Sequence, residues 1–114
     1  MKKTKLVDIT LDALNDAKAL DINVFDVTNL TSISDYMIVA SGRSNRQVSS
    51  IADKVIEAAK KNNYQTLGVE GKREGEWVLV DLGDVIVHVM HPESREYYQL
   101  EKLWNTDAVK AESN

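Results

Sequence analysis

Two apolar runs separated by Gly83-Asp84 dominate the hydrophobic pattern of the chain, in the segment WVLVDLGDVIVHVM at residues 77–90. A Gly-Asp pair between such runs predicts a two-residue hairpin, because glycine accepts the positive φ that a type II′ turn requires. The turn fixes the register, so Trp77 lies opposite Met90 and side chains alternate between two faces. One face is wholly aliphatic and is predicted to be core: Val78, Val80, Leu82, Val85, Val87 and Val89.

The other face of the hairpin is chemically mixed. It carries an indole, a carboxylate and an imidazole among aliphatic groups: Trp77, Leu79, Asp81, Ile86, His88 and Met90. Such a face is typical either of a second buried interface or of a recognition surface. Trp77 stands at the open end, where complete burial is difficult. A binding surface made of this face, the Gly83-Asp84 turn and Tyr98 is therefore at least as well supported as a core role.

The remaining periodicities define the fold class. Apolar positions at helical spacing predict three helices, at 6–20, from Asn45 onward and after Pro92. The second helix is the clearest, because Ser44 and Gln47 form a capping-box pattern before its apolar stripe. Short β-branched or aromatic segments predict strands at 22–27, 36–41 and around 66–69. Together with the hairpin, this order predicts an α/β fold, a single domain with a mixed sheet of about five strands and three helices.

Length and composition limit the architecture and its compartment. The chain has 114 residues and no cysteine. We assign the domain to residues 1–104 and expect a flexible C-terminal tail over 105–114, where large apolar groups are nearly absent. Disulfides and thiolate metal sites are excluded. A signal-peptide pattern and an apolar run of roughly 20 residues are also lacking, so we expect a soluble, cytoplasmic protein.

The charge balance restricts the class of partner. The formal net charge is −4. This acidity disfavours a broad electrostatic grip on nucleic acid, although it is compatible with a local basic patch. A basic protein is the more natural partner, and we expect no direct binding to nucleic acid.

The segment SGRSNRQ, at Ser41–Gln47, is the main candidate for nucleotide chemistry. It places Arg43 and Arg46 at the predicted start of the second helix, where free amides and the helix dipole favour anions. A nucleotide-binding or nucleotidyl-transferring enzyme is therefore the alternative hypothesis. A well-capped helix after a glycine turn is the favoured interpretation, because nucleotidyl transfer also needs paired carboxylates for magnesium and no Asp-x-Asp occurs. We expect no catalytic residue, cofactor or metal site.

The two histidines offer little further chemistry. His88 and His91 are three residues apart, and on a strand this spacing points them to opposite faces, which disfavours a shared metal ion. Asp81 and His88 are diagonal neighbours in the hairpin and could form a hydrogen bond. No glycine-flanked serine motif accompanies them, so we expect a structural pair that anchors the hairpin.

Three longer motifs carry a family resemblance. The segments TSISDYMIVASGRSNRQVSSIADKV, LGVEG and WVLVDLGDVIVHVMHPESREYYQLEKLW resemble the ribosomal silencing factors, the Iojap-like proteins of bacteria and organelles. The similarity runs from about residue 5 to Trp104, and the C-terminal motif is highly specific. It implies a nucleotidyltransferase-like fold without catalytic acids, and so a binding protein and not an enzyme.

The resemblance also implies a partner and a mechanism. Members of the family bind the large ribosomal subunit through its ribosomal protein fourteen, block joining of the small and large subunits, and repress translation when nutrients are scarce. Carried onto this chain, the partner-binding residues are Trp77, Asp81, Leu82, Gly83, Asp84, Val85, Tyr98 and Glu101. Leu82 and Val85 also belong to the predicted core face. We expect them to protrude at the tip of the sheet. A homodimer of the free protein, using the same apolar surface, is a further expectation.

Overall fold

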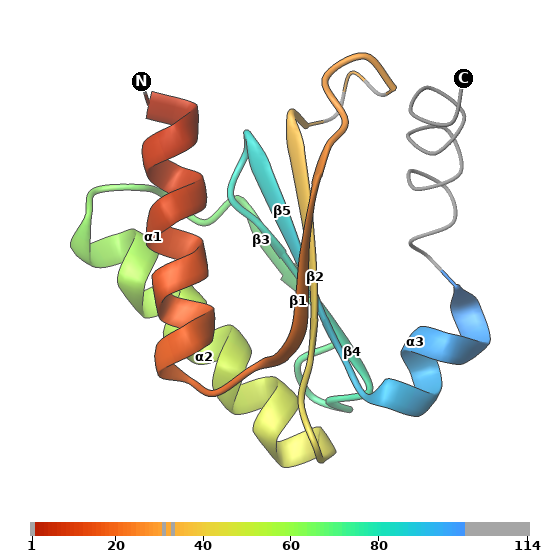
Figure 1. Ribbon diagram of the computed structural model, residues 1–114. Coiled ribbons are helices and arrows are strands. Elements are labelled where there is room, and N and C mark those ends of the chain that lie inside the picture. Colours follow the sequence, from red (N-terminus) through yellow and green to blue (C-terminus); the bar gives the residue numbers. More distant parts are fainter. Residues whose placement is uncertain (1, 31, 33, 100–114) are drawn as a thin grey trace.

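Five strands and three helices make up the fold in the computed structural model, which describes residues 2–30, 32 and 34–99 (Figure 1). The helices are α1 (Lys2–Asp16), α2 (Asn45–Lys61) and α3 (Pro92–Tyr98). The strands are β1 (Leu20–Asp26), β2 (Tyr36–Ser41), β3 (Gly68–Glu70), β4 (Trp77–Asp81) and β5 (Val85–Met90). This confirms the predicted α/β domain with a mixed five-stranded sheet.

The sheet has the order β1-β2-β5-β4-β3. The β2–β5 pair is parallel, and the β1–β2, β4–β5 and β3–β4 pairs are antiparallel. Helices α1 and α2 cover one face, whereas α3 lies on the other side of the sheet (Figure 1). We call these the helix-covered face and the α3 face.

The main core lies between the sheet and the helix pair α1 and α2. It joins apolar side chains from α1 and α2 to alternate residues of the central strands, among them Leu14, Ile38, Ile51, Val80 and Val87, all fully buried. Burial of one such side chain stabilises the fold by about 1.5–3 kcal/mol. A smaller apolar cluster, Val27, Met37 and Ile86, lies on the α3 face and is flanked by Phe25 and Leu79.

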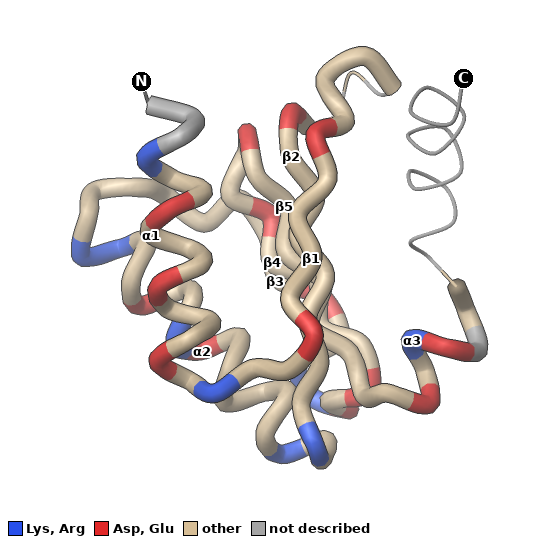
Figure 2. Tube along the Cα trace, viewed as in Figure 1, with Lys and Arg blue, Asp and Glu red and all other residues tan. Residues whose placement is uncertain are grey.

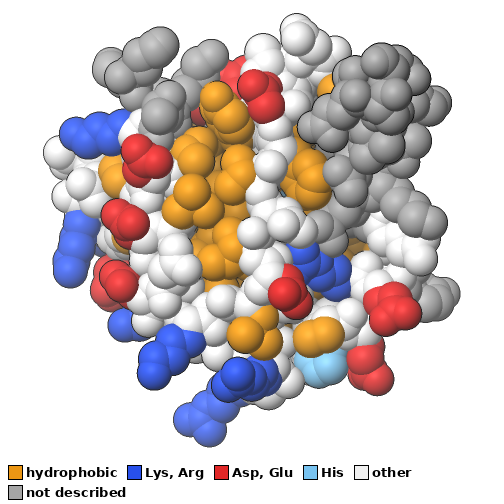
Figure 3. All heavy atoms as spheres, in the orientation of Figure 1, with side chains coloured by type: hydrophobic (Ala, Val, Ile, Leu, Met, Phe, Trp, Pro, Cys, Tyr) orange, Lys and Arg blue, Asp and Glu red, His pale blue; other side chains and the backbone are white. Residues whose placement is uncertain are grey.

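The helix-covered face is not closed at its β1 edge. Hydrophobic side chains show at the surface between α1 and β1 in the space-filling view (Figure 3). Val24, which pairs with Ile38 and so shares its face, is 41% exposed. In that view the hydrophobic side chains form one contiguous patch (Figure 3).

Helix α1 ends earlier than its apolar period predicts. The spacing extends to Leu20, but the helix stops at Asp16 because Lys18 adopts a left-handed φ of 62°. The backbone amide of Ala19 then bonds the Leu14 carbonyl (2.9 Å) and that of Lys18 bonds the Asn15 carbonyl (3.0 Å), which is a Schellman motif. Leu20 consequently begins β1.

Helix α2 begins where its sequence predicts. Ser44 is the N-cap, and its hydroxyl accepts the Gln47 backbone N–H at 3.1 Å. The Gln47 side chain in turn accepts the Arg43 backbone N–H, one residue before the N-cap. Gly42 precedes the cap against the helix, where a Cβ would lie 2.9 Å from the Val48 amide nitrogen. The favoured interpretation of Ser41–Gln47 as a capped helix start is confirmed.

Helix α3 is short in the described part of the chain. His91 is its N-cap, Pro92 occupies its first turn, and it ends at Tyr98. Leu100, Trp104 and the predicted tail at 105–114 lie outside the described residues. Within the described ranges, no helix has the length and hydrophobicity that crossing a membrane requires.

Candidate functional site

The β4–β5 hairpin has the register that the sequence predicts. Trp77 pairs with Met90, Leu79 with His88, and Asp81 with Ile86. The Leu82 amide bonds the Val85 carbonyl at 2.9 Å, and Gly83 has a φ of +93°. The turn therefore uses the positive φ for which a glycine was required.

The β5 residues of the mixed face, Ile86, His88 and Met90, are buried, so the candidate site centres on Trp77 at its edge. Trp77 is half-buried, and its indole N–H donates to Nδ1 of the buried His88 at 3.0 Å. The Tyr98 ring, at the end of α3, lies 5.0 Å from the Trp77 ring with an interplanar angle of 46°. Tyr98 is 56% exposed. The three rings thus run from the interior of the sheet to solvent, as the tilted geometry of aromatic pairs allows.

His88 belongs to the interior and does not form part of the surface. It is 4% exposed, and burial lowers its pKa from 6.5 to about 4, because a charged imidazole is poorly solvated there. At neutral pH the ring is uncharged. Nδ1 can then accept the hydrogen bond from the indole N–H, because an accepting ring nitrogen must carry no proton.

The predicted Asp81–His88 pair is wrong. Asp81 Oδ1 accepts the backbone N–H of Gly83 at 2.9 Å and so stabilises the turn, while His88 takes its hydrogen bond from Trp77. Trp77 and Asp81 both lie diagonally opposite His88 on β4, so the strand register allows either side chain to bond the imidazole. In the structure the indole N–H takes this position, and the Asp81 carboxylate bonds the turn instead.

Leu82 and Val85 do not protrude. Leu82 is 6% exposed and Val85 is completely buried, and both belong to the main core. The expectation that they extend past the helices at the tip of the sheet is therefore wrong. They flank the turn and lie two residues from Val80 and Val87, so strand alternation directs both side chains to the helix-covered face, where α1 and α2 pack.

The turn itself is accessible. Asp84 is exposed, and its carbonyl accepts the amides of Asp35 and Tyr36, each at 3.0 Å. Leu67, 64% exposed, lies beside it, with Cδ1 3.6 Å from where a Gly83 Cβ would be. Leu67 cannot be singled out from the sequence pattern. Its isolated apolar side chain before a three-residue strand gives no periodic signal.

The predicted partner-binding residues therefore fall into two groups. Trp77 and Tyr98 meet at the open end of the hairpin, whereas Gly83 and Asp84 lie at the opposite end of the same two strands. Asp81 is half-buried on the α3 face. Glu101 lies outside the described residues. The structure joins the two groups through one continuous hairpin and does not bring them into contact.

Acidic groups surround the aromatic end. A shallow hollow beside Tyr98 is lined by Glu76, Glu93, Ser94 and Tyr98. Acidic residues also lie along α3 in the charge-coloured trace (Figure 2). Exposed aromatic groups within an acidic surround fit a basic protein partner better than a polyanion.

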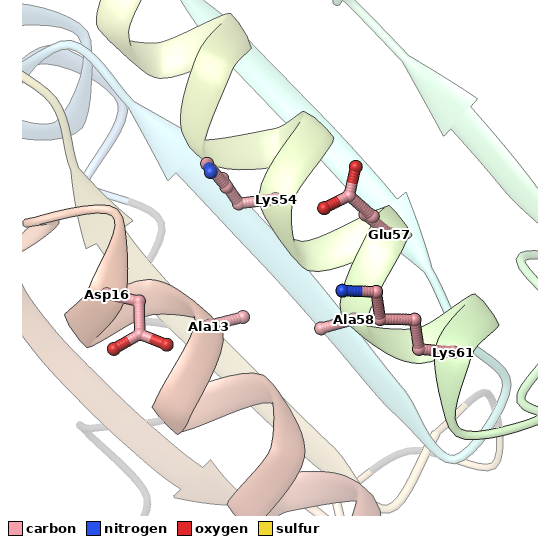
Figure 4. Close-up of a pocket in the computed structure, with 6 residues that line it drawn as sticks. All are labelled: Ala13, Asp16, Lys54, Glu57, Ala58 and Lys61. Carbon is pink, nitrogen blue, oxygen red and sulfur yellow. The ribbon is translucent and has the colours of Figure 1, made fainter.

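Other features offer little support for catalysis. Among the residues that the structure describes, no group of three or more His, Asp or Glu side chains is placed to hold a metal ion. A second hollow, between α1 and α2, has an alanine floor and charged rim residues that point in several directions: Ala13, Asp16, Lys54, Glu57, Ala58 and Lys61 (Figure 4). Its charged side chains do not converge on a common point, so we assign it no ligand.

Known proteins resemble this chain both in sequence and in structure. A family model described as "ribosomal silencing factor during starvation" matches residues 1–114. A ribosomal silencing factor from Haemophilus influenzae is 48% identical over 99 residues, covering 87% of this chain and 97% of its own. A crystal structure of a protein from Chromobacterium violaceum has a TM-score of 0.90 at 46% identity, over 92% of this chain and 88% of that one.

A more distant relative comes from mouse. The protein named mitochondrial assembly of ribosomal large subunit protein 1 is 33% identical over 101 residues, which cover 86% of this chain and 44% of the mouse protein. The bacterial and mitochondrial relatives thus share a domain of the same size.

Proposed function

Because the chain belongs to the ribosomal silencing factor family, we propose that it binds the large ribosomal subunit and sterically blocks joining of the small subunit. The contact is made through ribosomal protein fourteen of the large subunit. Translation is thereby repressed, chiefly when nutrients are scarce. The family's names support a role in translation regulation and association with the ribosome.

One observation carries the choice of surface. The Trp77–Tyr98 ring pair is the place where a half-buried anchor meets a mostly exposed aromatic group, and Glu76 and Glu93 lie around it. Tryptophan and tyrosine dominate the energetics of protein interfaces. A basic ribosomal protein would complement the surrounding carboxylates.

The rest of the partner surface follows the hairpin to its turn. Asp81 and Asp84 supply further acidic groups, and Gly83 allows close approach to the backbone of the turn. Leu67 adds an apolar contact beside it. Leu82 and Val85 contribute indirectly, by fixing the turn from the core. Glu101 stays a candidate from the family motif alone.

This action needs no turnover. We propose that the protein is not an enzyme, that it works in the cytoplasm, and that its fold is a nucleotidyltransferase-like one without catalytic acids. A homodimer of the free protein would cover Trp77 and Tyr98 and compete with the ribosome, since self-association is a common way to shield an apolar patch.

The binding proposal is tested by sedimenting the purified protein with purified large subunits, small subunits and isolated ribosomal protein fourteen. We expect saturable binding to the large subunit and to the isolated protein, at one copy each. Binding to small subunits alone, or calorimetric binding of ATP or CTP with magnesium followed by turnover, would contradict it and favour the enzyme hypothesis.

A further inference from the structure

Two basic segments that are far apart in the sequence lie together in the structure. The first is the start of α2, with Arg43 and Arg46, and the second is the 71–76 loop before β4, with Lys72 and Arg73. The hydroxyl of Ser49 on α2 donates to the Lys72 carbonyl at 2.8 Å and holds the two segments together. We call these four cationic residues the basic end.

The 71–76 loop is seated firmly against α2. Gly75 is buried with a φ of +75°, and a Cβ there would lie 2.5 Å from the Asn45 carbonyl oxygen, so only glycine fits this approach. The Gly75 amide bonds the Gly71 carbonyl at 3.0 Å and closes the loop. The position of Lys72 and Arg73 beside α2 is thus set by the packing of the backbone.

The charge of the basic end differs from that of the whole chain. Lys72 forms an ion pair with Asp53 at 2.6 Å. Arg43, Arg46 and Arg73 are exposed, and none of them has an ion pair among the residues that the structure describes. With Asp53, Glu74 and Glu76 counted, four cations against three carboxylates leave about +1 here, on a chain of net charge −4.

The opposite end of the sheet is acidic. Asp26, Asp35 and Asp84 occupy neighbouring chain segments there, since Asp35 donates its amide to the Asp84 carbonyl and Asp26 pairs with Tyr36. Figure 2 shows acidic positions at the upper ends of β1 and β2 and basic positions at the bottom of the view, near the start of α2. The cations of the basic end therefore lie at the other end of the strands from these three aspartates, although Glu76 and Glu93 also lie at that other end.

The basic end adjoins the proposed partner surface. Arg95 on α3 donates to the Ser41 hydroxyl at 2.9 Å, and the amide of His91 bonds the Glu76 carbonyl at 2.9 Å. The 71–76 loop also leads directly into Trp77. A particle that contacts Trp77 and Tyr98 therefore lies next to Arg43, Arg46 and Arg73.

We propose that the basic end contacts ribosomal RNA phosphates that flank the protein contact on the large subunit. This inference rests on the proposed function. Guanidinium groups suit phosphate because they donate paired hydrogen bonds, and the N-terminus of α2 adds a favourable dipole. The net negative charge of the chain keeps affinity for free RNA low. The contact acts only when the aromatic end is already engaged.

The test compares two charge variants at opposite ends of α2. Arg43→Gln/Arg46→Gln removes two cations from the basic end, and Lys60→Gln/Lys61→Gln removes two from the exposed last turn of α2 as a matched control. Dissociation constants are measured for purified large subunits from 50 to 300 mM salt, and for isolated ribosomal protein fourteen.

We expect the arginine variant to bind large subunits roughly tenfold more weakly at low salt. The slope of log affinity against log salt should become shallower by about one to two, as lost phosphate contacts require. Its affinity for the isolated ribosomal protein should match that of the wild type, and the lysine variant should match it in both assays.

Two results would overturn the inference. One is an unchanged salt slope and affinity of the arginine variant for large subunits. The other is an equal loss on the isolated ribosomal protein, which would place the arginines in a protein contact. Failure of the wild type to bind large subunits would instead refute the proposed function, and the two failures are therefore distinguishable.

Discussion

The indole N–H of Trp77 donates to Nδ1 of His88 at 3.0 Å, across directly paired strands. The bond ties a residue at the rim of the domain to a buried imidazole. Trp77 therefore supports the sheet as well as the proposed interface. Truncating it would remove the donor from a buried acceptor, at a cost of about 1–3 kcal/mol in stability.

The buried His88 predicts a pH dependence of stability. Its pKa is about 4 when folded and 6.5 when exposed. Between these values the unfolded state binds the proton and the folded state does not, so stability falls as pH drops from 6.5 to 4 and is unaffected by this group above that window. The whole effect is about 3 kcal/mol. Urea unfolding at pH 7.5, 5.5 and 4.5 measures it.

Carboxylates titrate in part of the same range, so the comparison needs His88→Gln, which cannot take up that proton. The variant should show a shallower fall in stability than the wild type over the same pH values. Parallel curves for the two proteins would show that His88 is not responsible.

Tyr98→Ala separates binding from folding better than a change at Trp77. Tyr98 is 56% exposed and meets the Trp77 ring at 5.0 Å. Its loss should cost ~1 kcal/mol of stability, the worth of an aromatic pair, and ~2 kcal/mol or more of binding to the large subunit. Thermal melting and sedimentation measure the two. Val24→Ala, on the helix-covered face, should bind normally, and equal binding by both variants would exclude α3 from the interface.

The hairpin was predictable because local rules determine it. Gly83 specifies the turn, the turn specifies the register, and alternation then assigns Val80 and Val87 to the core. The start of α2 was predictable for the same reason, since Ser44 caps it locally. These features depend on neighbours within a few residues.

What the sequence could not supply depends on tertiary packing. Lys18 takes a left-handed conformation that no apolar period reveals, so α1 ends before its predicted limit. The choice of Trp77 over Asp81 as partner of His88 depends on side-chain conformations, which the strand register leaves open. The basic end forms only because Gly75 packs on Asn45, across about thirty residues of sequence.

Leu82→Ala tests the correction at the turn. The side chain is 6% exposed within the main core, so truncation should lower the free energy of unfolding by about 2–5 kcal/mol. Binding, measured well below the melting temperature, should be nearly unchanged. Chemical denaturation measures the stability of the variant, and sedimentation measures its binding to the large subunit. A variant that is stable but does not bind would show that Leu82 belongs to the partner surface.

Asp84→Lys tests the electrostatics of the acidic end. Asp84 is exposed beside the turn, so reversing its charge should slow association with a basic ribosomal protein at low salt, with a smaller difference at high salt. Stopped-flow association rates at two salt concentrations measure this. Glu57→Lys on the exposed side of α2 carries the same charge change and should have little effect. Equal slowing by both would indicate a general effect of net charge.

The central claim is steric silencing, and light scattering of purified ribosomal subunits tests it most directly. Small and large subunits are mixed with increasing amounts of the protein, added either before or after joining. The account predicts inhibition that saturates near one copy per large subunit, acts only before joining, and is relieved by excess small subunits. Sub-stoichiometric inactivation, or equally rapid inhibition of preformed couples, would contradict it and indicate enzymatic modification.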